Sequence, residues 1–139
     1  MNNNDNHKSS NEFHVSKTAT SIKDEFFRSK NLEDRKDRFF KLCQKNPNKI
    51  PVVFERHPSS KLKCFPDIKF MTNRNIQLSF FAQQIRNVLK LSPESAMFFS
   101  TIGGIMIKHD SLMGELYDKG QDTNDGFLYI QFKEVESFG

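Results

Sequence analysis

The residues that could carry chemistry are few and scattered, and the one of most interest is the terminal residue, Gly139. A carboxyl group with no side chain beside it can thread a narrow enzyme channel and accept a nucleophile without steric obstruction. Glycine makes up about 7% of residues in proteins generally, so a terminal glycine alone does not establish that it reacts. Whether Gly139 is the natural end or was exposed by trimming is left open by the sequence.

The other reactive residue types form no catalytic or metal-binding pattern. The four histidines are scattered and share no metal-ligand spacing with the two cysteines, Cys43 and Cys64. Gly103-Gly104 lacks the Lys-Ser/Thr pair that would follow in a phosphate-binding loop. We therefore expect a protein that is not an enzyme and that uses no metal and no cofactor.

Charge, hydrophobicity and cysteine content indicate which kinds of partner and which cellular compartment to expect. Twenty-one Lys and Arg residues against 17 Asp and Glu give a net charge of +4, which is dispersed and accompanies no RNA-binding signature. We therefore expect no nucleic-acid partner and favour an acidic partner or an anionic membrane surface. No stretch approaches the ~20 apolar residues of a membrane-spanning helix. Two isolated cysteines suggest free thiols in a reducing cytoplasm.

The chain begins with a segment that is too polar to fold and continues with helical patterns. Residues 1–20 are rich in Asn and carry little apolar spacing, which predicts a disordered tail. A short helix is expected from Ser21, and a second one begins after Asn31 as its cap and ends at Asn46-Pro47. Residues 21–47 are thus predicted to be a helical extension.

The middle of the chain shows strand and helix periodicity in turn. Ile50–Glu55 and Ile68–Thr72 are β-branched and aromatic runs, which predict two strands paired as a hairpin. The apolar stripe from Leu78 to Leu89 predicts a helix that packs across the sheet and that Ser92-Pro93 closes.

The last third continues the alternation. Two strands, Met97–Ile102 and Ile105–Ile107, flank a tight turn at Gly103-Gly104. Asp110 is expected to cap a short helix that ends near Gly120, and Phe127–Phe132 reads as a strand buried on both faces.

The predicted order is therefore β-β-α-β-β-α-β after two helices, which is an α+β fold of the ubiquitin-like β-grasp type. The β-grasp domain is expected over residues 48–134 and a flexible C-terminal tail over 135–139.

Short motifs at compatible spacings carry a resemblance to a known family. They are Lys49-Ile50-Pro51-Val52-Val53 with Glu55, Lys69-Phe70, Phe81 with Ile85-Arg86, Met113-Gly114-Glu115-Leu116-Tyr117, Asp125-Gly126-Phe127-Leu128-Tyr129, and Ser137-Phe138-Gly139. In this order they resemble the autophagy ubiquitin-like modifiers, which include GABARAP and the microtubule-associated protein light chains. The resemblance covers roughly residues 27–139.

The resemblance implies that Gly139 is conjugated to phosphatidylethanolamine. It implies as partners E1-like and E2-like enzymes and a cysteine protease of the conjugation pathway, contacted through Arg86 and Phe138. The protein would be cytoplasmic and would move to the membrane of the autophagosome or another cytoplasmic vesicle after lipidation. A ubiquitin-like adaptor that binds peptides or cytoskeleton and is never conjugated is the alternative.

The resemblance also implies that cargo receptors bind through aromatic-x-x-aliphatic motifs, which add a strand along residues 69–73. By this mapping, a first pocket consists of Leu42, Pro51, Val53, Lys69, Met71 and Phe127. A second pocket consists of Phe70, Thr72, Asn73, Ile76 and Phe81. Lys49, Lys61, Lys63 and Lys69 would form a basic rim, and an ordinary solvated surface is the alternative for each of these lysines. For each apolar residue of these sets, ordinary core packing is an equal alternative.

Two departures from the family bear on partner choice. Arg38 stands where the family usually has an acid, and it can donate but not accept a hydrogen bond. This suggests that a Trp anchor is disfavoured relative to Phe or Tyr. Phe70-Met71-Thr72-Asn73 replaces the frequent Tyr-Leu-Val-Pro, which makes the second pocket more polar and the first more pliable.

Overall fold

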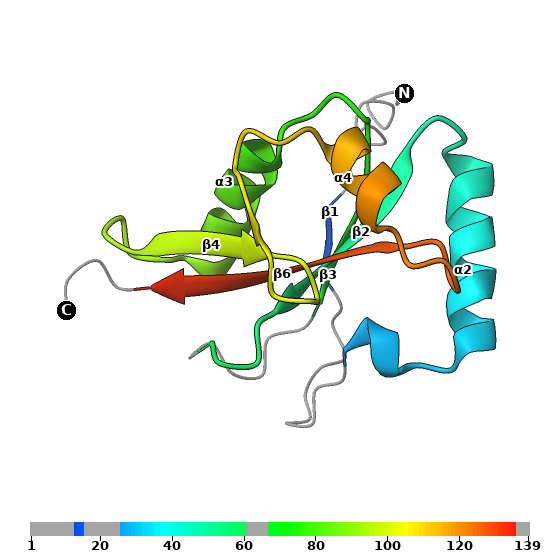
Figure 1. The fold of residues 1–139 in the computed structure, drawn as a ribbon, viewed down its shortest axis with the longest axis horizontal. Helices are drawn as coiled ribbons and strands as arrows, with labels where there is room; N and C mark the ends of the chain where they lie inside the picture. Colours follow the sequence, from blue (N-terminus) through cyan, green and yellow to red (C-terminus); the bar gives the residue numbers. More distant parts are fainter. Residues whose placement is uncertain (1–12, 16–25, 61–66, 136–139) are drawn as a thin grey trace, which may run out of the picture.

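The computed structural model describes residues 13–15, 26–60 and 67–135. Six strands form one sheet in the order β1-β3-β2-β6-β4-β5 (Figure 1). The strands are β1 (Phe13–Val15), β2 (Ile50–Arg56), β3 (Ile68–Thr72), β4 (Ala96–Ser100), β5 (Met106–Ile107) and β6 (Leu128–Val135). The helices are the 3-10 turn η1 (Phe27–Ser29), α2 (Leu32–Lys45), α3 (Leu78–Leu89) and α4 (Met113–Gly120). From β2 to β6 this is the predicted order.

The sheet is mixed, with one parallel pair at its centre. β2 and β6 run parallel, with Val52 opposite Leu128, whereas β2–β3 and β4–β6 are antiparallel. The predicted hairpin of the first two β-grasp strands is therefore confirmed. β6 is buried over Leu128–Phe132, as expected of a strand covered on both faces.

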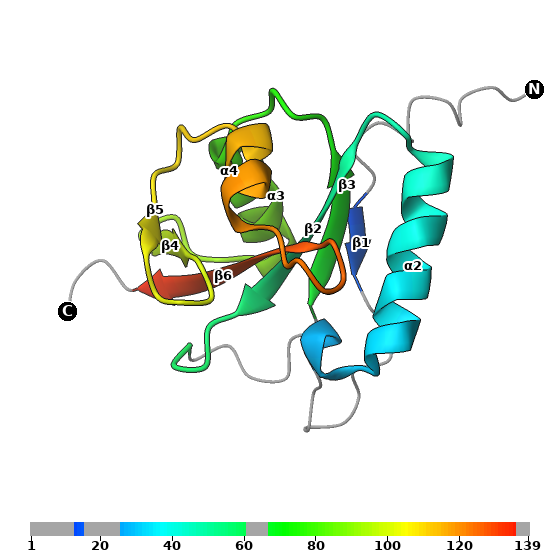
Figure 2. The same ribbon diagram turned by 45° about the vertical axis from the view of Figure 1, so that its right-hand side comes forward.

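Two hydrophobic layers lie on opposite faces of this sheet. Figure 2 shows α3 and α4 on one side of β2 and β3 and α2 on the other. The larger layer centres on the Phe54 ring, which lies 5.5, 5.7 and 5.9 Å from the rings of Phe70, Phe81 and Phe99. Burying each such side chain contributes about 1.5–3 kcal/mol. No helix among the described residues is long and apolar enough to cross a membrane.

The start of α2 follows the local sequence. The Asn31 side chain accepts a hydrogen bond from the Glu33 N–H at 2.8 Å, which confirms the predicted cap. Glu33 and Asp34 lie in the first turn, near the positive end of the helix dipole. The helix ends at Lys45, directly before Asn46.

The ends of α3 and α4 differ from the prediction. α3 ends at Leu89, three residues before Ser92-Pro93, because Lys90 takes a φ of 54° and its N–H donates to the carbonyls of Arg86 and Asn87. Asp110 does not cap α4. The cap position is Leu112, and the N–H groups of Met113 and Gly114 donate instead to the carbonyls of Ile76 and Arg74. Distant loop carbonyls therefore replace the expected side-chain cap.

The β4–β5 turn uses only one of its two glycines in the left-handed region. Gly104 has a φ of 95°, and Gly103 is not in that region. The Thr101 carbonyl accepts from the Gly104 N–H at 2.9 Å, and the Thr101 N–H donates to Ile105. Both strands are therefore shorter than predicted.

The N-terminal segment differs most from its prediction. Residues 1–20 were expected to be disordered, yet Phe13–Val15 pair with β3, so the prediction is wrong for these three residues. The other residues of the predicted tail lie outside the described part. Of the helix expected from Ser21, only η1 falls on described residues. Val135, predicted to begin the C-terminal tail, is the last residue of β6.

Candidate functional site

The predicted site is built around β3, whose side chains alternate between the two faces of the sheet. The Lys69 ammonium lies 5.2 Å from the centre of the Phe27 ring, on the face that α2 covers. The Phe70 ring lies 4.4 Å from that of Phe81, on the face that α3 covers. The two predicted pockets thus belong to different faces of one strand.

The residues predicted for the first pocket meet on the α2 face. Pro51 is opposite Met71 and Val53 is opposite Lys69 in the β2–β3 pair. Val53 and Phe127 are fully buried in a cluster with Phe27 and Tyr129, against which Phe39 and Leu42 pack. The rings of Phe27 and Phe39 approach that of Phe127 edge-on at 4.9 and 5.8 Å. Aromatic contacts of this kind add to the stabilisation that burial provides.

An open groove of about 490 Å³ lies beside this cluster, along α2. It is lined by Phe27, Lys30, Asp34, Asp37, Arg38, Lys41, Leu42 and Lys45. Leu42 and Arg38, both singled out from the sequence, therefore border one cavity. Four of the eight lining residues are basic and two are acidic, so the groove favours an acidic ligand. Burial lowers the pKa of Lys69, and the charges of Arg38 and Lys30 lower it further.

The residues predicted for the second pocket form no comparable opening. Phe70 and Phe81 are only 2% and 0% exposed and belong to the main core, against which Ile76 packs. Thr72 is fully buried, and Asn73 is half-buried. Phe70 and Phe81 therefore belong to the core, and Ile76 and Asn73 are the less buried residues of this set.

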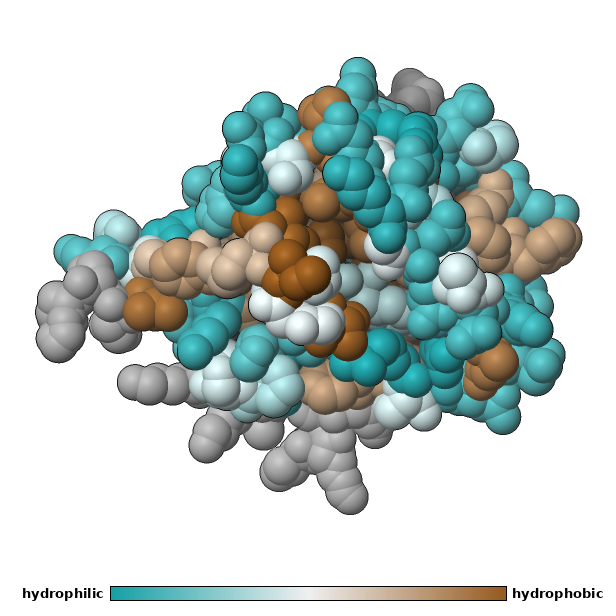
Figure 3. Space-filling model, viewed as in Figure 1, coloured by the Kyte–Doolittle hydropathy of each residue, from teal (hydrophilic) through white to brown (hydrophobic). Residues whose placement is uncertain are grey.

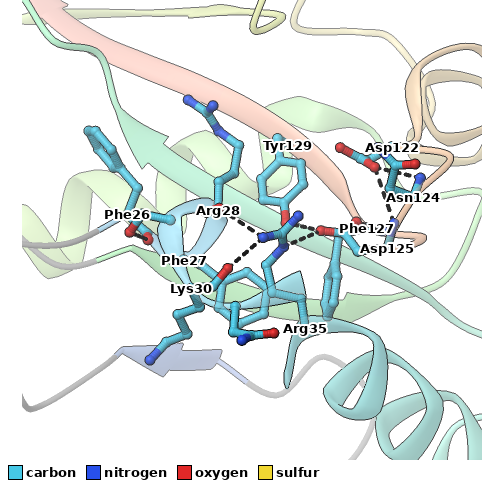
Figure 4. A network of polar contacts seen from close by, with 12 residues as sticks. Phe26, Phe27, Arg28, Lys30, Arg35, Asp122, Asn124, Asp125, Phe127 and Tyr129 are labelled. Carbon is cyan, nitrogen blue, oxygen red and sulfur yellow. Dashed lines mark hydrogen bonds and ion pairs between the residues drawn. The ribbon is translucent and has the colours of Figure 1, made fainter. Parts of the chain in front are cut away.

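A network of polar contacts holds α2 and η1 on the sheet (Figure 4). Arg35 donates from Nε to Asp125 Oδ2 at 2.8 Å, and from Nη1 to the Lys30 carbonyl at 2.6 Å. Asp125 also accepts from the Tyr129 hydroxyl at 2.5 Å and from the Phe127 N–H at 2.9 Å. Burial and this hydrogen bond raise the pKa of the Tyr129 hydroxyl.

Two further contacts join η1 to the strands. Arg28 makes a two-point ion pair with the buried Glu55, at 2.7 and 3.0 Å, and Gln131 donates to the same carboxylate at 3.4 Å. Asp67, directly before β3, accepts from the Phe27 N–H at 2.5 Å. The carboxylate thereby fixes Phe27 in the wall of the groove.

Sequence reasoning did not identify these positioning residues. Asp125-Gly126 stood out only as a resemblance motif and a loop before a strand. The one usable signal was an acidic residue close before a buried strand: Asp67 directly precedes β3, and Asp125 stands three residues before β6.

The remaining predicted site residues lie elsewhere. Arg86 donates to the carbonyls of Ser95 at 2.9 Å and Ser92 at 3.3 Å, so it fastens the loop after α3. Lys49 is half-buried just before β2. Phe138 and Gly139 lie outside the described residues, as do Lys61 and Lys63 of the predicted basic rim.

A second hollow, of about 660 Å³, lies at the other end of the sheet, between the β4–β5 turn, α4 and the start of β6. Ile102, Ile105 and Met106 line it, and Ile105 is 70% exposed. The brown surface near the centre of Figure 3 shows apolar side chains gathered over this region. None of the predicted site residues lines it.

Comparisons with known proteins identify the family of this chain. The family described as "Autophagy protein Atg8 ubiquitin like" matches residues 34–139. Autophagy-related protein 8 of Schizosaccharomyces pombe is 31% identical over 118 residues, covering 85% of this chain and 93% of that protein. Autophagy-related protein 8d of Arabidopsis thaliana is 30% identical over 108 residues, covering 78% and 88%.

A solved structure supports the fold. The crystal structure of Trypanosoma brucei ATG8 superposes with a TM-score of 0.68 at 25% identity, covering 81% of this chain and 96% of that one. The predicted α+β, ubiquitin-like architecture and the resemblance noted in the sequence are both confirmed. With the family match running over three quarters of its length to the last residue, the chain belongs to the Atg8 family of autophagy ubiquitin-like proteins.

Proposed function

We propose that this chain is a modifier joined through the Gly139 carboxyl to the amine of phosphatidylethanolamine. The observation that carries the proposal is the family match, which extends to Gly139 itself. Members of this family are protein tags rather than catalysts. Activation would therefore fall to E1-like and E2-like partner enzymes, and trimming of any longer precursor to a cysteine protease.

Conjugation supplies the membrane attachment. Each buried methylene contributes about 0.8 kcal/mol, and two acyl chains hold a protein stably where one chain is marginal. The protein would thus exchange between the cytoplasm and the membrane of the autophagosome or another cytoplasmic vesicle. Arg86 and Phe138 are the residues that we assign to contacts with the conjugation enzymes.

The test compares the full chain with a form that lacks Gly139, both expressed in the source cells under starvation. We expect a mobility shift and flotation with membranes for the full chain only. Replacing Phe138 by Ala, with Gly139 retained, separates loss of enzyme contact from loss of the acceptor carboxyl. If the full chain stays cytosolic with one mobility, conjugation is wrong and the non-conjugated adaptor takes its place.

We further propose that the β3 edge and the α2 groove bind cargo receptors through extended acidic peptides of the aromatic-x-x-aliphatic type. The basic lining of the groove and the strand already paired with β3 support this assignment. The aromatic side chain would enter beside Leu42, and Lys49 and Lys69 would meet acidic flanking residues.

Charge reversal tests the peptide site. Arg38→Glu should weaken an acidic peptide, mainly by slowing association, because Arg38 lines the groove and is exposed. Lys108→Glu is the matched control, since Lys108 is also exposed and lies next to β5, at the opposite edge of the sheet. Equal weakening by both substitutions would show that net charge, and not this groove, governs binding.

A further inference from the structure

The edge of β3 that a peptide would need is already paired with the chain itself. β1 runs antiparallel to β3, with Phe13 opposite Phe70, His14 opposite Lys69 and Val15 opposite Ile68. Figure 2 shows β1 beside β3 on the side where α2 lies, and the groove is lined by residues of η1, of α2 and of the link between them. β1 therefore lies where a docked peptide strand would have to lie.

Pairing along this edge is exclusive. A strand presents one set of backbone N–H and C=O groups on each side, and β2 uses the set on the other side of β3. A peptide added along residues 69–73 would require the backbone groups on the β1 side of this edge, and alternate residues of β3 supply them. β1 already pairs with this edge over Ile68–Phe70, so the peptide and β1 cannot pair with that part of it at the same time.

The contact is suited to being displaced. β1 has only three residues, and its two apolar residues, Phe13 and Val15, are two positions apart rather than the three of the expected ligand motif. Among the described residues, none pairs with Met71 or Thr72 on the β1 side. An incoming peptide could begin pairing there and then replace β1 residue by residue.

The tether compensates for this short pairing. Eleven residues, 16–26, separate Val15 from Phe27, which is fixed on the domain. A link of this length gives an effective concentration on the order of millimolar. If β1 is paired about 90% of the time, the apparent affinity of a competing peptide falls about tenfold.

We propose that Phe13–Val15 acts as a built-in competitor for the β3 edge, so that a peptide must displace it in order to bind. This inference rests on the proposed peptide-binding function. As a consequence, a peptide must exceed a minimum affinity or local concentration in order to bind. Peptides with strong anchor residues, or with several motifs held close together, displace β1, and single weak motifs do not.

The experiment compares the full chain, a form that begins at Ser21, and His14→Pro in the full chain. Proline removes a backbone donor and so disrupts the pairing of β1 with β3 at the middle residue of β1. Asn4→Pro, outside β1, is the matched control. The probe is a fluorescent acidic peptide with an aromatic-x-x-aliphatic motif. We expect about tenfold tighter binding for the truncated form and His14→Pro, and no change for Asn4→Pro.

A second measurement does not depend on any added peptide. Amide hydrogen exchange at Ile68–Phe70 should be faster in His14→Pro than in the full chain, because β1 no longer protects this edge. Unchanged exchange, or equal peptide affinity of the full and truncated forms, overturns the proposal. Faster exchange without any peptide binding upholds the competitor contact and overturns the peptide-binding function instead. The gain in peptide affinity on removal of β1 should not depend on the concentration of the protein. If this gain vanishes when the protein is diluted, β1 pairs with a second copy, and the intrachain contact is overturned.

Discussion

Arg38 offers no hydrogen-bond acceptor to an anchor that enters the groove beside it. It lines the cavity along α2 together with Leu42, and its guanidinium offers donors only. An indole N–H entering here would find no acceptor on this residue, whereas a phenyl ring would lose nothing.

We therefore predict that matched peptides with Phe or Tyr as the anchor bind at least as tightly as the one with Trp. Arg38→Glu should shift the ratio of Trp to Phe affinity toward Trp by about two- to tenfold, the value of one hydrogen bond. Isothermal titration of each pair gives this ratio, and Lys108→Glu should leave it unchanged. A clear Trp preference in the unmodified chain would exclude this role for Arg38.

Asp67 gives the chain a pH-dependent term in its stability. Burial raises the pKa of this carboxyl to about 7 from its ordinary value of 3.8, although the Phe27 N–H bond opposes the rise. Glu55 raises the pKa further, and Lys69 and Arg28 lower it. The folded state therefore keeps a proton that the unfolded state releases between these two values.

We predict that this group stabilises the fold below about pH 4 and loses that contribution as the pH rises to about 7. Asp67→Asn, which can still accept from Phe27, should flatten this part of the pH profile of the unfolding free energy. Urea denaturation across the range provides the measurement. A slope that survives in Asp67→Asn would assign the effect to another group.

The residues that the sequence predicted well are those that act on neighbours. Asn31 caps a helix two residues away, so its role could be inferred from its position. Asp67 and Asp125 act on Phe27 and Arg35, which are 40 and 90 positions distant. No local pattern contains such a pairing, because only the folded topology brings these residues together.

At the scale of elements, one ion pair with a fully buried carboxylate contributes to the attachment of α2. The Arg35 side chain is 13% exposed and that of Asp125 is fully buried, and Asp125 also holds Tyr129. Removing one partner of such a pair leaves a buried charge without compensation.

We predict that Arg35→Ala destabilises the fold by about 3–5 kcal/mol, and Tyr129→Phe by about 1 kcal/mol. Arg35→Ala combined with Asp125→Ala should cost less than the sum of the two single changes, because neither charge is then left alone. Urea unfolding of the unmodified chain, the two single variants Arg35→Ala and Asp125→Ala, and the double variant completes the cycle. Lys41→Ala is the control, since its ion pair with Asp37 is largely exposed.

Elements whose form depends on their own residues were predicted correctly. Elements whose form depends on contacts with another part of the chain were missed or misplaced. The apolar stripe of α3 and the run of β6 depend on residues within each element. α3 was predicted at its observed bounds, and β6 was predicted to begin one residue early and to end three residues early. β1 is a three-residue strand in a polar segment, and only the edge of β3 makes it a strand. The start of α4 was misplaced for the same reason, since the Ile76 and Arg74 carbonyls receive its first N–H groups.

At the scale of the whole molecule, the predicted boundary at residue 48 cuts through a shared core. Phe27, Phe39 and Leu42 belong to the predicted extension, yet they pack against Val53 and Phe127 of the β-grasp domain. The predicted extension and the domain therefore share one hydrophobic cluster.

We predict that a chain starting at Ser21 unfolds within about 1 kcal/mol of the full chain, because only the short β1 pairing is lost. A chain starting at Asn48 exposes a hydrophobic face and should bind the dye ANS or aggregate. Urea unfolding and light scattering distinguish the two. A monomeric, cooperatively folded chain from residue 48 would show that the α2 layer is dispensable.

The position of β6 has a mechanical consequence. β6 is paired on both sides, and its parallel partner β2 leads back to α2 and the start of the domain. When a chain anchored by its C-terminal end is pulled from its N-terminal side, β2 and β6 are drawn in opposite directions along their length. The pulling force then acts on all the backbone hydrogen bonds between β2 and β6 together, in shear. It does not break them one at a time. We expect the domain to resist traction between a membrane and a bound load far better than its equilibrium stability would suggest.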